Sequence, residues 1–170
     1  MAEGPYVKCV VVGDPGVGKT SLIASYETGC FPYQNIPLVI DKYTTERKTD
    51  EWSATICIWD TASGPEHDVM RPLSYQDTNA VVICYSTSNP DSFYNVRSKW
   101  WPEAYHNAYG VPIILVGTKT DVRLNLPWDR PRVTTDQGQE LANEIGAVNF
   151  VECSALTHEN RDWVFHYAAE

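Results

Sequence analysis

The sequence predicts an α/β fold with a mostly parallel, six-stranded sheet, helices on both of its faces and one antiparallel strand at its edge. First, runs rich in β-branched residues alternate with segments of helical pattern, as in strands that are joined by crossover helices. The runs lie at residues 7–12, 54–59, 80–85, 112–116 and 149–152. Second, residues 43–59 read as two strands joined by the polar turn Thr49-Asp50-Glu51. This stretch has no room for a helix and therefore predicts an antiparallel hairpin.

Four helices are expected along the chain, at residues 19–26, 90–108, 135–145 and 157–168. The third is the best defined, because Thr-Thr-Asp opens it and Gly146 can end it. No repeat, low-complexity tract or linker interrupts the pattern. With 170 residues and 43% hydrophobic content, residues 1–170 are expected to form a single domain with one core.

The charge balance and the cysteines exclude several classes of function. Acidic residues outnumber basic ones by 22 to 13, and the net charge of -9 would repel the phosphates of nucleic acids and anionic lipid head groups. Five cysteines without metal-ligand spacing fit a reducing compartment. No apolar stretch approaches the roughly 20 residues of a membrane span. We therefore expect a cytoplasmic protein that does not bind nucleic acid.

A loop with the pattern of phosphate-binding proteins follows the first predicted strand directly. Residues 13–20 read Gly-Asp-Pro-Gly-Val-Gly-Lys-Thr, which matches Gly-x-x-x-x-Gly-Lys-Ser/Thr between a strand and a helix. The glycines let successive N–H groups point at one phosphate, Lys19 adds a charge near the β and γ phosphates, and Thr20 offers a hydroxyl to Mg²⁺. A glycine-rich turn that merely starts a helix would explain neither side chain. The nucleotide-binding residues expected here are Asp14, Pro15, Gly16, Val17, Gly18, Lys19, Thr20 and Ser21.

Two later segments are suited to guanine. Residues 117–121 read Gly-Thr-Lys-Thr-Asp, where the Asp121 carboxylate can accept hydrogen bonds from both N1–H and the exocyclic amino group of the base. The aliphatic stem of Lys119 can lie along the base. Residues 152–156, Glu-Cys-Ser-Ala-Leu, can offer a backbone N–H to the guanine carbonyl. Each segment alone could be a solvated turn, but both follow successive strands downstream of a phosphate loop. The base-site residues expected here are Thr118, Lys119, Asp121, Ser154, Ala155 and Leu156.

Together with Trp-Asp-Thr-Ala at residues 59–62, these motifs resemble those of a Ras-type G domain, in collinear order from about Tyr6 to about Phe165. Four further segments narrow the resemblance to Rho proteins, especially Rac-like ones. They are residues 29–32, 70–75, 99–103 and 111–123. The resemblance implies a P-loop G domain that binds GTP or GDP with Mg²⁺.

The resemblance also implies roles for residues outside these loops. Phe31 would contact the edge of the guanine, although it could equally be an apolar anchor for its own loop. Asp60 would hold Mg²⁺ through water, beside Thr20. Effector and regulatory proteins would bind through residues 31–43 and 60–75.

Four departures from the Rho pattern fall where hydrolysis and switching take place. The first switch of Rho proteins has a threonine after its proline, where residues 35–38 here read Asn-Ile-Pro-Leu, and the Leu38 side chain cannot ligate Mg²⁺. In the second switch, the simplest register puts Ser63 at the glycine that meets the γ-phosphate and Gly64 at the catalytic glutamine. A register shifted by one puts Pro65 there instead. Pro15 stands where most relatives have glycine or alanine.

No residue is therefore assigned a catalytic role, and GTP hydrolysis is expected to be weak. A similar loss of the glutamine occurs in the Rnd branch of the Rho family, whose members look constitutively GTP-bound. Three readings stay open: a slow GTP-bound signalling protein, a normally cycling GTPase, and a pseudo-GTPase that serves as an interaction module.

Two regions differ from Rho proteins outside the switches. Residues 124–132 are shorter than the usual insert and contain Pro127 and Pro131, so the charged insert helix is expected to be missing. The sequence reaches Glu170 without a polybasic tail or a Cys-a-a-X box. A truncated chain and an unlipidated protein fit this equally, and membrane association is expected only if the full-length protein is lipidated.

Overall fold

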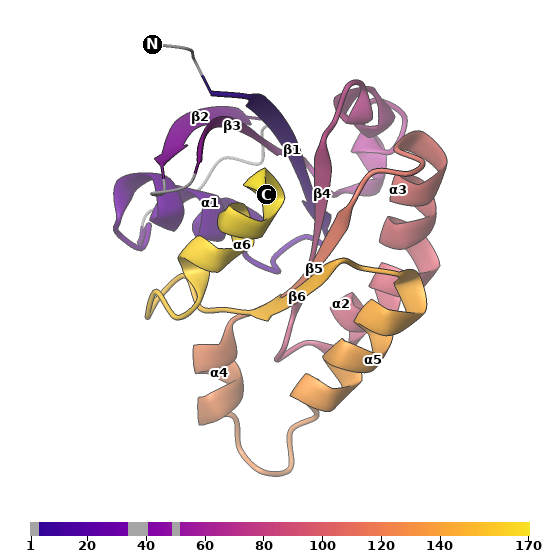
Figure 1. The fold of residues 1–170 in the computed structure, drawn as a ribbon. Coiled ribbons are helices and arrows are strands. Elements are labelled where there is room, and N and C mark those ends of the chain that lie inside the picture. Colours follow the sequence, from indigo (N-terminus) through magenta and orange to yellow (C-terminus); the bar gives the residue numbers. More distant parts are fainter. Residues whose placement is uncertain (1–3, 34–40, 49–51) are drawn as a thin grey trace.

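The computed structural model describes residues 4–33, 41–48 and 52–170 and is built around one six-stranded sheet (Figure 1). The strands follow the order β2-β3-β1-β4-β5-β6 across the sheet. Their bounds are β1 (Tyr6–Gly13), β2 (Asp41–Lys48), β3 (Ser53–Asp60), β4 (Ala80–Ser86), β5 (Ile113–Thr118) and β6 (Asn149–Glu152). Among the strands of the described residues, β2 alone pairs antiparallel; it lies at the edge of the sheet, next to β3. The predicted α/β fold is confirmed, while the turn at residues 49–51 lies outside the described residues.

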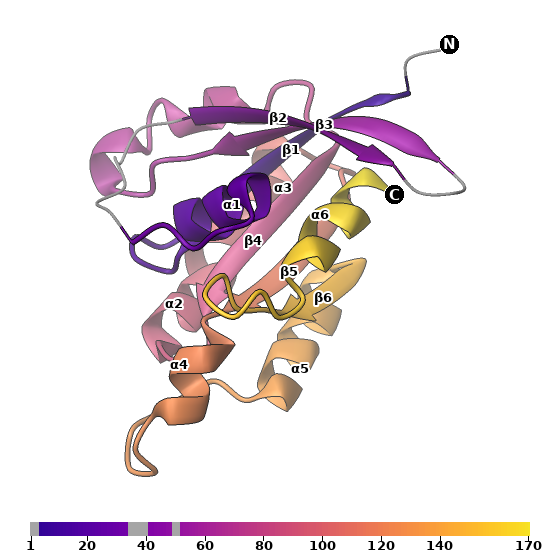
Figure 2. The same cartoon turned by 90° about the vertical axis from the view of Figure 1, so that its left-hand side faces the viewer.

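Helices cover both faces of the sheet, as Figure 2 shows from the side. Their bounds are α1 (Lys19–Thr28), α2 (Pro90–Asn95), α3 (Trp101–Asn107), α4 (Thr120–Asn125), α5 (Thr135–Ile145) and α6 (Arg161–Ala169). A π-helical turn at Val96–Trp100 joins α2 to α3, so the predicted helix at 90–108 forms almost over its whole length. Helices α1 and α6 pack on one face, and α2, α3 and α5 pack on the other. None of the helices in the described ranges is long and apolar enough to cross a membrane.

Strands β1 and β4 are largely hydrophobic because helices cover both faces of the sheet there, whereas the edge strand β2 is mostly polar. Alternate residues of β1 belong to different cores: Cys9 and Val11 face α1 and α6, while Val10 and Val12 face the other helices. All four side chains are fully buried. Alternation along a strand sends successive side chains to opposite faces, so a strand covered on both sides reads as a continuous apolar run.

The helices differ from the prediction in several places. Helix α4 was not predicted, α1 continues to Thr28 rather than ending at residue 26, and α6 begins at Arg161 rather than at residue 157. The φ angles of His158 and Asn160 are 70° and 52°, in the left-handed region that interrupts a helix. Two short 3₁₀ helices, Pro65–His67 and Arg71–Tyr75, were also unforeseen.

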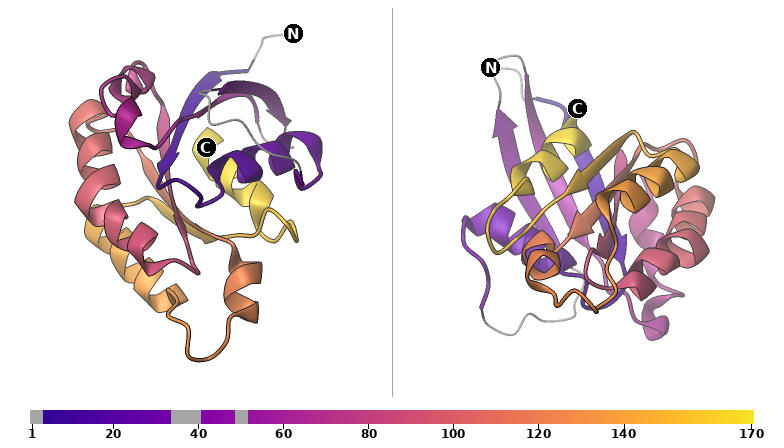
Figure 3. Two further views of the ribbon diagram at one scale, coloured as in Figure 1. Left: turned by 180° about the vertical axis from the view of Figure 1, so that it is seen from behind. Right: turned by 90° about the horizontal axis from the view of Figure 1, so that it is seen from below.

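The stretch between α4 and α5 projects from the body of the molecule (Figure 3). Residues 126–134 form no helix, in agreement with the prediction from Pro127 and Pro131, although the first two residues of the predicted stretch 124–132 belong to the end of α4. The guanidinium of Arg132 holds this stretch together by donating hydrogen bonds to the carbonyl oxygens of Arg123, Leu126 and Pro127. Helix α5 then starts at Thr135, and the preceding Thr134 forms the predicted N-terminal cap, because its hydroxyl accepts the backbone N–H of Gln137.

Gly138 of α5 allows the helix to approach the sheet closely. A Cβ atom built at Gly138 would lie 2.4 Å from a ring carbon of Phe150 and 2.4 Å from the Tyr85 hydroxyl oxygen. We expect Gly138→Ala to lower the free energy of unfolding by about 1–3 kcal/mol, although alanine is the better helix former. Chemical denaturation of Gly138→Ala and of the exposed neighbour Glu140→Ala tests this, with the second expected within about 0.5 kcal/mol of the native value. A more stable Gly138→Ala would contradict the close contact.

Candidate nucleotide-binding site

The loop between β1 and α1 has the backbone curvature that a phosphate cradle needs. Gly16 and Gly18 have φ angles of 77° and 96°, which residues with a side chain rarely adopt. A Cβ atom at Gly13 would lie 2.3 Å from the carbonyl oxygen of Cys84 on the neighbouring strand. The loop therefore depends on its glycines both to turn and to lie against β4.

The ammonium group of Lys19 lies inside this loop and is almost fully buried. It donates hydrogen bonds to the carbonyl oxygens of Gly13 and Asp14, at 2.8 and 3.0 Å, and to the Ser63 hydroxyl oxygen at 2.9 Å. Only 6% of the residue is exposed, and this burial lowers the pKa of the Lys19 ammonium. The lysine is held where the loop curls, as the phosphate-loop pattern requires.

Two side chains whose oxygen atoms can bind a metal, Thr20 and Asp60, meet beside Lys19. The Thr20 hydroxyl at the start of α1 donates a hydrogen bond to the carboxylate of Asp60 at the end of β3. Hydroxyl and carboxylate oxygens are the ligands that Mg²⁺ prefers, together with phosphate oxygens and water. The described residues contain no cluster of three or more His, Cys, Asp or Glu suited to a metal. By their chemistry, the Thr20 hydroxyl and the Asp60 carboxylate fit a magnesium ion that takes its remaining ligands from phosphate and water.

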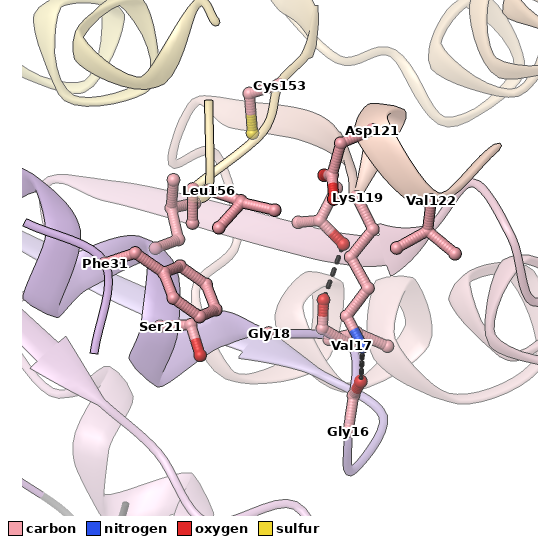
Figure 4. A pocket seen from close by; sticks show the side chains of 13 residues that line it. Gly16, Val17, Gly18, Ser21, Phe31, Lys119, Asp121, Val122, Cys153 and Leu156 are labelled. Atoms are coloured by element: carbon pink, nitrogen blue, oxygen red, sulfur yellow. Dashed lines mark hydrogen bonds between the residues drawn. The ribbon is translucent and has the colours of Figure 1, made fainter. Parts of the chain in front are cut away.

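A cavity of about 400 Å³ opens next to the loop and is drawn in Figure 4. Many predicted nucleotide-binding residues line it, namely Gly16, Val17, Gly18, Ser21, Phe31, Thr118, Lys119, Asp121, Ala155 and Leu156. Three further lining residues were not predicted: Leu22, Val122 and Cys153. Burial raises the pKa of the Cys153 thiol, which keeps it neutral. The volume lies in the range of small-molecule sites.

The last residue of β5 and the residue after it each donate one hydrogen bond to the phosphate loop (Figure 4). The Lys119 ammonium donates to the Gly16 carbonyl oxygen at 2.6 Å, and the Thr118 hydroxyl donates to the Val17 carbonyl oxygen at 2.5 Å. Lys119 itself has a φ of 59°, in the left-handed region, where the extended backbone of β5 ends. Its side chain lines the cavity. The expected base site and the phosphate loop are thus connected directly by hydrogen bonds.

Ser154 lies behind Asp121 rather than in the cavity wall. Its hydroxyl donates to the Asp121 carboxylate at 2.7 Å and accepts the backbone N–H of Thr157 at 3.1 Å. Helix α4 begins at Thr120, so its first turn carries Asp121. Ser154 is therefore placed to orient the carboxylate, and a direct contact with the nucleotide remains a prediction.

Asp14 and Pro15 also lie outside the cavity lining. The Asp14 carboxylate accepts hydrogen bonds from the Trp100 indole nitrogen at 2.8 Å and from the Asn95 amide at 2.6 Å. Asn95 ends helix α2 and Trp100 ends the π-helical turn, and both lie in the helical layer on the face of the sheet opposite to α1. The side chain of Asp14 thus anchors the phosphate loop to that layer, a role that its place in the motif does not reveal.

The segment after β3 is fixed by a buried arginine. Arg71 is fully buried and donates hydrogen bonds to the carbonyl oxygen of Ala62 at 3.1 Å and to Glu103 at 2.7 Å. Its guanidinium stacks on Trp100, 4.6 Å from the ring centre. This network keeps Ser63 turned toward Lys19, whereas Gly64 has no side chain to present. Residues 35–38, including Leu38, lie outside the described residues.

Comparisons with known proteins agree with this arrangement. The model of the Ras family matches residues 8–170, and the chain therefore belongs to the Ras family of small GTPases. The chain is also similar to a Ras-like GTP-binding protein, RhoL, of Drosophila melanogaster. The two are 43% identical over 162 residues, which cover 95% of this chain and 84% of that protein.

Replacement of Asp121 tests the expected base site. Asp121→Asn exchanges one acceptor for a donor, so we expect the preference to move from guanine toward xanthine nucleotides. Competition of GTP, XTP and ATP against a fluorescent guanine nucleotide measures this, with the exposed Asp129→Asn as the matched control. Equal affinity of the native protein for ATP and GTP would remove the basis for assigning Asp121 to the base.

Replacement of Lys19 tests the phosphate loop separately. Lys19→Ala removes the charged hydrogen bonds to phosphate, and we expect GTP affinity to fall by at least about a hundredfold. The exposed Lys42→Ala serves as control because it removes the same charge away from the cavity. Fluorescence titration gives both affinities, and native-like binding by Lys19→Ala would place the phosphates elsewhere.

Proposed function

We propose that this Ras-family domain is a Rho-like GTP-binding signalling protein with slow GTP hydrolysis that acts by binding effectors. It takes GTP or GDP with the phosphates and Mg²⁺ between the phosphate loop and the segment after β3, and with the base in the cavity beside the segments after β5 and β6. Residues 1–170 serve as a single G domain. The proposal rests on the residues after Asp60. There the Ser63 hydroxyl contacts Lys19, and Gly64 has no side chain that could orient the attacking water.

Slow hydrolysis follows from what this stretch lacks. In-line attack on the γ-phosphate needs a water that a side chain orients, and a glutamine does this in Ras-type enzymes. Gly64 and Pro65, the two residues that can occupy that position, have no hydrogen-bonding side chain. Pro15 is exposed at the tip of the phosphate loop, where an arginine finger from a partner would enter.

A surface for effectors adjoins the same stretch. Val69, Met70 and Leu73 are 85%, 60% and 64% exposed, while Arg71 between them is fully buried. The buried arginine holds the backbone, so the apolar side chains face outward on a fixed support. We assign effector and regulator binding to residues 60–75, and to residues 31–43 by family resemblance. The protein acts in the cytoplasm, at a membrane only if the full-length chain is lipidated.

A normally cycling GTPase is the second candidate, and the intact Lys19 and the Thr20–Asp60 pair favour it. Both candidates bind the same nucleotide and differ in its fate. Chromatography of the nucleotide released from purified protein separates them: GTP supports the proposal, and GDP supports cycling. An empty site would instead point to an interaction module without nucleotide control.

Restoring the family residues tests the cause of slow hydrolysis. We expect single-turnover hydrolysis to rise when Leu38→Thr, Ser63→Gly and Gly64→Gln are combined, and by more than with any one change, because these groups act as a unit. Room for the glutamine exists, since the nearest atoms to a Cβ at Gly64 belong to the carboxylate end of Glu66, an exposed and flexible side chain.

Pro15→Gly is added as a separate step, with and without a Rho-type activating protein. The activating protein is expected to accelerate the native chain very little, because its arginine works together with the missing glutamine. A native protein that already hydrolyses GTP as fast as the restored variant would establish the cycling GTPase.

A further inference from the structure

Ser63 occupies a position where its hydroxyl contacts the charged end of Lys19. The two atoms are 2.9 Å apart, and Ser63 is only 7% exposed. Ras-type domains have a glycine at the corresponding position in the simplest register, so this contact is a property of the present chain. It places a neutral acceptor on the ammonium group that the phosphate-loop pattern assigns to the β and γ phosphates.

The contact with Ser63 affects phosphate binding because the Lys19 ammonium has only three N–H groups to donate. A lysine ammonium has three N–H groups, and here they point to Gly13, Asp14 and Ser63. A diphosphate needs one of these donors, whereas a triphosphate that uses both its β and γ phosphates needs two. With a diphosphate, Lys19 can keep both the Gly13 carbonyl and Ser63. With a triphosphate it can keep only one protein acceptor.

Ser63 cannot withdraw without cost, because the residues before it are fixed. The Thr61 hydroxyl donates to the Val11 carbonyl oxygen at 2.7 Å, and the Ala62 carbonyl oxygen accepts from the buried Arg71 at 3.1 Å. Both bonds tie the backbone to the body of the domain. The hydroxyl is therefore held opposite Lys19, and a γ-phosphate has to displace it from the ammonium.

We infer that Ser63 is a specificity-determining residue that lowers the preference for guanosine triphosphate over diphosphate by competing with the γ-phosphate for Lys19. The inference rests on the proposed function, in which Lys19 binds the phosphates of a guanine nucleotide. It concerns the ratio of the two affinities and is separate from the rate of hydrolysis.

Two variants of Ser63 test the inference. Ser63→Ala removes the hydroxyl, and Ser63→Thr keeps it. GTP and GDP are each competed against a fluorescent GDP analogue at fixed Mg²⁺, over times short compared with hydrolysis. The ratio of GTP to GDP affinity is expected to rise about tenfold in Ser63→Ala, the effect of one hydrogen bond to a charged group, and to stay near the native value in Ser63→Thr.

The outcomes separate this inference from the proposed function. An unchanged or lowered ratio in Ser63→Ala overturns the inference, as does a Ser63→Thr protein that binds GDP normally but has the ratio of the alanine variant. Failure of the native protein to bind either nucleotide would instead overturn the proposed function. Thermal unfolding of each variant confirms that the ratios are compared between folded proteins.

Discussion

The buried ammonium of Lys19 is the constraint around which the site is built. A charge with 6% exposure is costly unless each of its donors finds an acceptor, and here all three acceptors come from the protein. Two of them require the loop after β1 to curl, which in turn requires glycine at positions 16 and 18. The third requires the segment after β3 to lie against the loop. Satisfying one charge thus brings two separate segments together.

The same loop is braced from two other directions. Lys119 and Thr118 hold its tip from β5, and Trp100 holds the Asp14 side chain from the helical layer. Trp100 also carries the guanidinium of Arg71, so the helix that fixes the loop fixes the segment after β3 as well. A site braced in this way has little left to order when a ligand binds, which favours affinity. A substitution at one of these contacts is therefore expected to disturb the others as well.

The sequence predicts the features that depend on local pattern. Five strands follow from β-branched runs, β2 follows from the hairpin pattern, and helix α5 follows from its cap at Thr134 and its glycine end at Gly146. The loop residues of the cavity follow from motifs whose spacing matches a chemical task. Contacts between residues far apart in the chain carry no such signal: the bond from Trp100 to Asp14 spans 86 positions. Nor does composition reveal that Asn160 adopts a positive φ and delays the start of α6.

The two departures after Asp60 act on different quantities, and their effects on the bound nucleotide oppose each other. In the proposed function, the missing side chain at Gly64 lengthens the life of GTP once it is bound. By our inference, the hydroxyl of Ser63 weakens the binding of the γ-phosphate to Lys19, while a diphosphate can still accept a hydrogen bond from Lys19. The resting nucleotide therefore depends on how the hydrolysis rate compares with the rate of exchange. If exchange is slower than hydrolysis, GDP accumulates despite Gly64. If exchange is faster, the affinity ratio that we infer for Ser63, together with the concentrations of GTP and GDP, decides which nucleotide is bound.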